Sequence, residues 1–166
     1  MNILNISEAS SEQKAQIESI FWESSSIQSF QSQKAKDEFL YKYLSGYYDY
    51  PEYFYYVTKD TEVLGYVCGF HNQYYDHEYY QKADIPLKFK PHLHINMSDK
   101  SRGMGLGSKL IQFYALKLKE LGHSGVHIIT ADGDKSINFY QKNGFEILQV
   151  FDYKGRKLVA LCSSLA

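Results

Sequence analysis

The sequence predicts an α/β sandwich in which a mostly antiparallel sheet is flanked by helices. Two observations lead to this fold class. Strand-like and helix-like segments follow one another in the order strand, helices, three strands, helix, strand, helix, two strands. In addition, only the central strand–helix–strand unit has the length of a parallel crossover. The 166 residues suit one domain, so we expect a single domain over residues 1–166.

The first third of the chain is predicted to form one strand and two helices. Residues Ile3–Ile6 form a short apolar run, and Glu12–Trp22 has apolar residues at helical spacing. Ser10 or Ser11 suits the N-cap of that helix. We expect a second helix over Gln33–Leu44, before a glycine and a tyrosine-rich turn.

The middle of the chain contains a predicted β-hairpin and a long loop. Tyr53–Thr58 and Glu62–Phe70 are rich in tyrosine, phenylalanine and valine, and three polar residues separate them. The segment His71–Pro91 has no clear period and is expected to be a loop or insertion. Its tyrosines, Tyr74, Tyr75, Tyr79 and Tyr80, either stack on a bound sugar or peptide or only pack.

The second half is the more regular part. His92–Met97 alternates polar and apolar residues, which predicts a strand with His92, His94 and Asn96 on one face. A long amphipathic helix follows from Leu106 to Leu121, before Gly122. The remaining expected elements are a strand over Val126–Thr130, a helix over Lys135–Lys142, and strands over Phe145–Phe151 and Lys157–Cys162.

Composition excludes several classes of protein. The formal charge is −1, which provides no field for nucleic acid or an anionic membrane, so we expect neither partner. Cys68 and Cys162 are far apart and form no disulfide framework or zinc spacing, so no metal site is expected. The sequence has no signal-peptide pattern and no membrane-length apolar run, which favours a cytoplasmic protein.

The turn between the His92–Met97 strand and the following helix is rich in glycine. Gly103, Gly105 and Gly107 let the backbone turn tightly and present N–H groups, and the helix start adds donors and a positive dipole end. The spacing matches neither a P-loop nor a dinucleotide-binding fingerprint. A pyrophosphate is therefore the expected ligand, with a nucleoside triphosphate or nicotinamide cofactor disfavoured.

Two motifs resemble those of the GNAT acetyltransferase superfamily. Arg102, Gly105 and Gly107 match its Arg/Gln-x-x-Gly-x-Gly/Ala signature. The segment Phe139–Phe145 is similar to a second signature, aromatic-Tyr-x-x-x-Gly-Phe, and Tyr140 lies 38 residues after Arg102. The sequence departs from the family pattern at Gly133, where an asparagine is frequent, and at Asp99, where a proline is usual.

The resemblance implies a GNAT fold with a six- to seven-stranded mixed sheet, about four flanking helices and a splayed central strand pair. It implies acetyl-CoA as cosubstrate, with the pyrophosphate on backbone N–H groups of the turn. The backbone of Met97 would bind the thioester carbonyl, and Arg102 would fix the turn. The implied cofactor-binding residues are Met97, Ser98, Arg102, Gly103, Met104, Gly105, Leu106, Gly107, Ser108 and Asn138.

The same resemblance implies direct transfer of an acetyl group to a primary amine in a ternary complex. Tyr140 would protonate the departing thiolate. His94 is the first candidate for the base that deprotonates the amine, ahead of His92 and His127. Pro91–Met97 also resembles a strand of the acetyltransferase-like domains related to O-GlcNAcase, some of which do not bind cofactor.

Several alternatives stay open at this point. The chain is either an enzyme or a non-catalytic GNAT-like binding module, and an enzyme could use another acyl chain or an oxygen acceptor. The acceptor is a small-molecule amine, an amino sugar or a protein amine. The protein is expected to be a monomer or a homodimer, with Lys157–Cys162 as a candidate edge strand for dimerisation.

Overall fold

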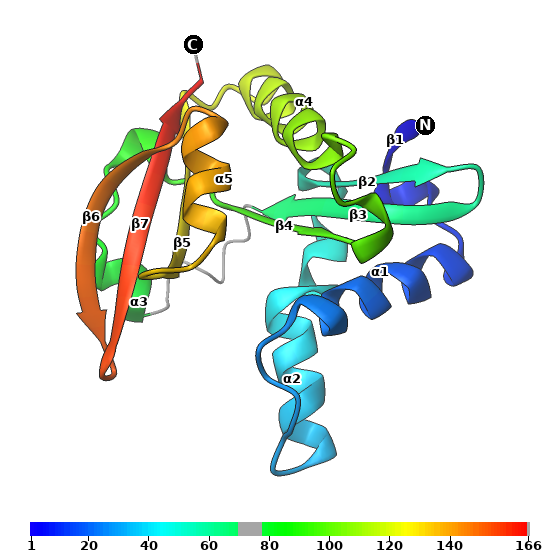
Figure 1. The fold of residues 1–166 in the computed structure, drawn as a ribbon, viewed down its shortest axis with the longest axis horizontal. Coiled ribbons are helices and arrows are strands. Elements are labelled where there is room, and N and C mark those ends of the chain that lie inside the picture. Colours follow the sequence, from blue (N-terminus) through cyan, green and yellow to red (C-terminus); the bar gives the residue numbers. More distant parts are fainter. Residues whose placement is uncertain (70–77, 166) are drawn as a thin grey trace. The chain divides into compact units, whose positions relative to one another are not determined.

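Strands and helices follow the predicted order, with one additional short helix, through residues 1–69 and 78–165, which the computed structural model describes (Figure 1). The contacts divide the chain into two compact units, which are described separately. The first unit covers residues 1–69 and 94–114, and the second covers residues 70–93 and 115–166. The elements are β1 (Asn2–Asn5), α1 (Ser11–Ser24), α2 (Gln33–Tyr43), β2 (Phe54–Lys59), β3 (Glu62–Gly69), α3 (Glu78–Lys82), β4 (Leu93–Met97), α4 (Leu106–Glu120), β5 (Gly125–Ala131), α5 (Ser136–Lys142), β6 (Glu146–Tyr153) and β7 (Arg156–Ser164).

The first unit is built on a four-stranded sheet in the order β1-β2-β3-β4. β1 and β3 both pair antiparallel with β2, which confirms the predicted hairpin. Tyr55 and Tyr56 are consecutive in β2, so their side chains lie on opposite faces of the sheet. Tyr55 contacts the rings of Phe113 and Tyr114 in α4, whereas the Tyr56 hydroxyl lies 3.3 Å from the Gln13 side chain in α1. Helices therefore cover both faces of this sheet, which explains why β2 is rich in large aromatic residues.

Local sequence signals fix the position of α1. The Ser10 side chain accepts a hydrogen bond from Gln13 N at 3.1 Å, and the Gln13 side chain accepts one from Ser10 N at 3.0 Å. This capping box identifies Ser10, and not Ser11, as the N-cap. The predicted face of α1 is buried through Ile17, Ile20 and Phe21.

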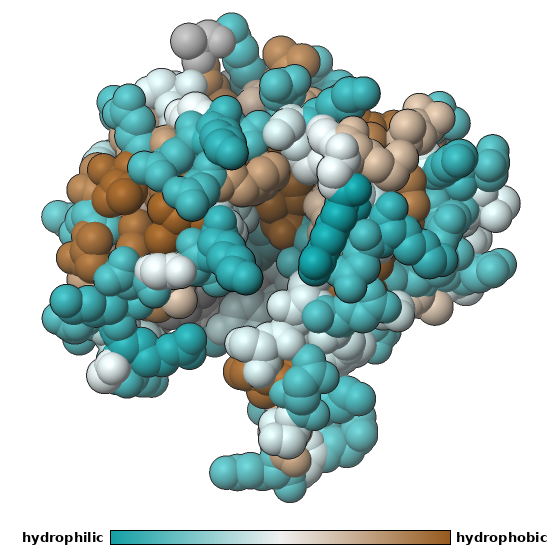
Figure 2. Space-filling view, in the orientation of Figure 1, coloured by the Kyte–Doolittle hydropathy of each residue, from teal (hydrophilic) through white to brown (hydrophobic). Residues whose placement is uncertain are grey.

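The second unit contains a three-stranded antiparallel sheet in the order β5-β7-β6. β7 lies in the middle, so the prediction that Lys157–Cys162 forms an exposed edge is wrong. The outer strands are β5 and β6, and in β6 the side chains of Ile147, Leu148 and Val150 are exposed. Figure 2 shows hydrophobic surface over the part of this unit where β6 lies.

Within the predicted loop His71–Pro91, the residues that the structure describes contain more secondary structure than the sequence suggested. The chain forms α3 and a 3₁₀ turn at Leu87–Phe89, and Phe89 packs against β5 so closely that Gly125 has no room for a side chain. The prediction of a loop is wrong for these segments. Tyr74 and Tyr75 lie outside the described residues.

The strands β4 and β5 belong to different sheets. The only described backbone bridge between the segment leading into β4 and β5 is the parallel pair His92 and His127. No helix within the described residues combines the length and the hydrophobicity that a membrane span requires.

Candidate active site

The glycine-rich turn has the backbone conformation that its sequence predicts. Gly103 and Gly105 have φ values of +76° and +68°, in the left-handed region that favours glycine. A side chain built at either glycine would meet no atom within 4 Å. The glycines are therefore required by backbone conformation, and the surface above them is open to a ligand.

The start of α4 supplies hydrogen-bond donors beside this turn. The hydrogen bond from Lys109 N to Gly105 O, at 3.2 Å, is the first backbone hydrogen bond of the helix. The N–H groups of Leu106, Gly107 and Ser108 precede it and so have no partner within the helix. Since the Leu106 side chain is buried, its backbone is anchored and the donors are held in place. Such a helix start attracts anions.

Arg102 is bound within the turn. One of its guanidinium nitrogens lies 2.7 Å from a carboxylate oxygen of Asp99, and both side chains are largely exposed. Arg102 N also donates to Asp99 O at 3.3 Å. This geometry fits the predicted role of Arg102 in fixing the turn. It also gives Asp99, the departure from the family pattern, a local function as the partner of Arg102.

The end of β4 is held tightly against β3. Ser98 N donates to Leu64 O at 3.0 Å, and the Met97 side chain lies directly over Gly65. A Cβ atom at Gly65 would lie 2.4 Å from Met97 Sδ and 2.9 Å from Asn96 O. Gly65 thus allows the close approach that positions the Met97 backbone. Sequence analysis missed this residue, although a lone glycine inside a strand is a known sign of such an approach.

His94 and Asn96 share one face of β4, as predicted, and border a cavity of about 230 Å³. The other walls come from α1 with the residues after it, and from α2. The His94 ring makes edge contacts with Tyr43 and Tyr47, at centroid distances of 6.3 and 5.7 Å. Asn96 Nδ2 donates to the Tyr66 hydroxyl at 2.7 Å. His94 is thus held at a cavity by aromatic neighbours, in the first unit.

Tyr140 and Asn138 lie on α5 in the second unit. Tyr140 is 5% exposed and packs between the rings of Phe139 and Phe145, at 5.4 and 5.6 Å. Burial, with a smaller contribution from Asp134, raises the pKa of the Tyr140 phenol well above its usual value. A phenol with the ordinary pKa of about 10 is already protonated at neutral pH, so the raised pKa does not add to its ability to donate a proton.

The other two candidate bases, His92 and His127, are buried in the second unit. His127 is 1% exposed, and its Nδ1 lies 2.6 Å from Phe89 O. Burial lowers the pKa of His127 to about 4 despite this bond. Such a group is a weak proton acceptor at neutral pH, and His92 is equally buried. The structure therefore favours His94 over both as the candidate base.

The cysteines do not form an alternative nucleophilic site. Cys68 and Cys162 are buried free thiols, and burial raises the pKa of each. A thiol that stays protonated is a poor nucleophile. In the part of the chain that the structure describes, no group of histidine, cysteine, aspartate and glutamate side chains is arranged to hold a metal ion.

Comparison with known protein families matches this chain to one model. Residues 14–145 match the model of the acetyltransferase (GNAT) family. The chain belongs to the GNAT acetyltransferase family. This match includes the glycine turn, β4, and α5 with Tyr140, and it assigns the chain to a family of acyl-CoA-dependent acetyltransferases.

Solved structures show the GNAT fold over the whole chain. An aminoglycoside 6'-N-acetyltransferase complexed with coenzyme A is 13% identical, with a TM-score of 0.72, covering 100% of this chain and 98% of that one. An N-acetyltransferase from Staphylococcus aureus Mu50 is 17% identical, with a TM-score of 0.68 and coverage of 99% and 98%. The aminoglycoside 6'-N-acetyltransferase from Enterococcus faecium is 12% identical, with a TM-score of 0.70 and coverage of 100% and 98%.

These matches do not refine the family assignment further. None of the curated protein sequences compared with this chain matches it. The matches also give no support to the closer resemblance to the acetyltransferase-like domains related to O-GlcNAcase.

Proposed function

We propose that this protein transfers an acetyl group from acetyl-CoA to a primary amine by direct attack. The observation that carries the proposal is the turn at 102–105, whose left-handed glycines lead into three N–H groups that have no partner within α4. That arrangement suits a pyrophosphate. It follows directly on β4, whose last residues would hold the thioester.

The residues proposed for the pyrophosphate are those of the turn and first helical turn. They are Arg102, Gly103, Met104, Gly105, Leu106, Gly107 and Ser108. Acetyl-CoA, when bound, supplies a thioester whose carbonyl carbon accepts the amine. A backbone N–H at Met97 would stabilise the negative charge that develops on the carbonyl oxygen. Ser98 and Asn138 complete the proposed cofactor set.

Proton movements then involve two side chains. The neutral amine nitrogen forms a bond to the carbonyl carbon, and the bond from carbon to sulfur breaks. Tyr140 gives its phenolic proton to the departing sulfur, and the nitrogen loses its extra proton to His94 or to water.

The acceptor amine is proposed to enter the cavity beside His94 and Asn96. This cavity lies on β4, the strand whose end carries Met97, so an amine bound there approaches the strand proposed to hold the thioester. Phe21, Phe39 and Tyr43 give it apolar walls, and Ser24–Ser26 add hydroxyl groups. A small-molecule amine, an amino sugar and the amine of a protein side chain all suit this mixture.

The test is calorimetric titration of the protein with acetyl-CoA, compared between two charge substitutions. Gly105→Glu introduces a carboxylate at the proposed pyrophosphate site, and we expect micromolar binding to weaken by on the order of 100-fold or more. Gly155→Glu is the matched control, since Gly155 also has a positive φ of +74° and open space around it, but lies in the β6–β7 turn.

Each outcome is informative. Binding that is lost in Gly105→Glu and retained in Gly155→Glu supports the cofactor site, and a screen of amines with Tyr140→Phe as control then tests catalysis. Absence of binding by the unsubstituted protein contradicts the enzyme and leaves a GNAT-like binding module.

A further inference from the structure

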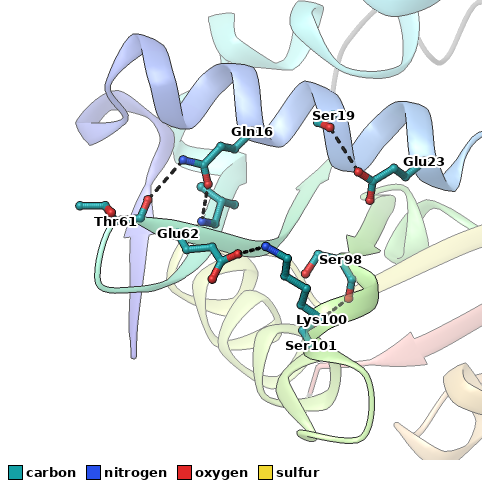
Figure 3. A network of polar contacts seen from close by, with 9 residues as sticks. Gln16, Ser19, Glu23, Thr61, Glu62, Ser98, Lys100 and Ser101 are labelled. Atoms are coloured by element: carbon teal, nitrogen blue, oxygen red, sulfur yellow. Dashed lines mark hydrogen bonds and ion pairs between the residues drawn. The ribbon is translucent and has the colours of Figure 1, made fainter.

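A second cavity in the first unit lies apart from the one beside His94. Its volume is about 390 Å³, within the range of about 300–1,000 Å³ typical of small-molecule sites. It is lined by residues of α1, the start of β3 and the 3₁₀ turn after β4, and it shares no lining residue with the His94 cavity. Figure 3 shows the polar side chains around it.

The walls of this cavity are fixed by backbone contacts. Gln16 of α1 accepts a hydrogen bond from Val63 N at 2.7 Å and donates to Thr61 O at 3.4 Å, which ties the helix to the start of β3 (Figure 3). Ser101 Oγ donates to Ser98 O at 2.7 Å and holds the turn after β4. Hydrogen bonds within this unit therefore hold the walls of the cavity in place.

The charges around the cavity are predominantly negative. Glu23, Glu62 and Asp99 line it, and Lys100 is its one cationic lining residue. Lys100 is bound to Glu62, and Asp99 is bound to Arg102. Among the residues described, the partner of Glu23 is the neutral hydroxyl of Ser19, at 3.2 Å. Glu23 therefore faces the cavity without a cation of its own.

Ser98 provides an independent sign of a missing ligand. Its residue is 8% exposed, and its Oγ is buried with no hydrogen-bond partner among the described residues. A buried hydroxyl without a partner is unfavourable, because it loses water and gains nothing in return. Ser98 lines the same cavity as Glu23 and Glu62, so a ligand there could bind all three.

The chain itself shows what kind of group the site accepts. The Lys100 ammonium forms an ion pair with the Glu62 carboxylate. The pKa of Lys100 is raised by its bond to Glu62 and, more weakly, by the charge of Glu23. The carboxylates do not converge on a point that would hold a metal ion. Ile20 and Val63 contribute apolar surface between the charges, which suits a hydrocarbon chain.

We propose that the cavity formed by Glu23, Glu62, Ser98 and Asp99 is a binding site for an alkyl diammonium compound. One ammonium group binds Glu23 and the Ser98 hydroxyl, and the second replaces Lys100 at Glu62. The site shares Ser98 with the proposed acetyl-CoA site and no lining residue with the acceptor cavity, and the proposal does not depend on catalysis.

The test is a titration of the labelled protein with 1,4-diaminobutane at low ionic strength and without acetyl-CoA, followed by amide chemical shifts. We expect saturable shifts at Glu23, Glu62 and Ser98. Glu23→Gln should weaken binding about fivefold to tenfold, the loss expected for a partly exposed charge-assisted hydrogen bond. Glu12→Gln is the matched control, because Glu12 is exposed on the first turn of the same helix.

A substitution of Lys100 gives a prediction of opposite sign. Lys100→Met removes the internal ammonium from Glu62, so diaminobutane should bind more tightly, by about fivefold or more. Lys34→Met is the matched control, because it also removes an exposed lysine from a carboxylate partner, Glu38 on α2, outside the cavity, and it should have little effect.

Three results would overturn the proposal. They are an absence of saturable shifts at these residues, equal affinity in Glu23→Gln and the unsubstituted protein, and the same shifts with 1,4-butanediol or with Mg²⁺ at equal concentration. Because no acetyl-CoA is present, these results are independent of whether the proposed transferase activity exists.

Discussion

The substitution Gly65→Ala tests the packing that positions the end of β4. On intrinsic grounds it should stabilise the strand by about 0.5–1 kcal/mol, because glycine loses more backbone freedom on folding than alanine. The structure predicts the opposite sign. The new methyl group would lie 2.4 Å from Met97 Sδ, 2.6 Å from Met97 Cε and 2.9 Å from Asn96 O.

The magnitude follows from which of these atoms can move. Met97 is only partly buried, so its flexible side chain can rotate away and lose some packing. Asn96 O belongs to the backbone of β4, which is bonded to β3 at Ser98 and cannot retreat freely. Overpacking of this kind costs about 1–3 kcal/mol. After the intrinsic gain is subtracted, we expect a net destabilisation of about 1–2 kcal/mol and a fall in Tm of about 3–6 °C.

The assay is thermal unfolding, followed by circular dichroism, of Gly65→Ala, Met97→Ala and the double variant. Removing the Met97 side chain relieves the closest contacts, so the double variant should be more stable than the sum of the single effects by about 1 kcal/mol. We also expect weaker binding of acetyl-CoA by Gly65→Ala, because the β4 backbone shifts. A rise in Tm on Gly65→Ala, or strictly additive effects, would refute the reasoning.

Three further predictions concern single residues. Tyr140→Phe should bind acetyl-CoA normally but lower kcat by about 100-fold, as loss of a general acid does, and steady-state kinetics with an accepted amine measures it. Because the pKa of buried His127 is lowered to about 4, the unfolded state binds a proton more readily than the folded state, so stability should fall as pH drops from about 6.5 to about 4. The fall should reach up to about 3 kcal/mol in denaturant titrations, and His127→Gln should largely abolish it. Ser10→Ala should lower the free energy of unfolding by about 1 kcal/mol through loss of the α1 cap, whereas Ser11→Ala should have a smaller effect.

Local periodicity and turn residues predicted most of the fold. The β2–β3 hairpin, α1 and the strands of the second half have bounds within a few residues of those expected. The order of strands within the second sheet was not predictable, because β6 and β7 are both apolar and pairing depends on contacts distant in sequence. The turn at Leu87–Phe89 was missed because its position depends on packing of Phe89 against Gly125, which no local pattern encodes.

The candidate site was predicted unevenly. The glycines at 103 and 105 were identifiable, since a left-handed backbone before a helix requires a particular residue type. The preference for His94 over His127 depends on burial, which an alternating pattern of polar residues does not reveal. The cavity beside Glu23 joins residues separated by up to 84 positions, from Gln16 to Lys100, and no single segment of sequence contains it.

The course of the chain through the two units has a consequence for how the protein folds. The chain leaves the first unit after residue 69, returns at residue 94 and leaves again after residue 114. During synthesis, only three strands of the first sheet can pair until β4 and the turn that follows it have emerged. Neither unit is a continuous segment that could be expressed alone. The glycine-rich turn at 102–105 thus belongs to the segment that closes the first unit, and contacts distant in sequence are expected to make its formation a slow, late step.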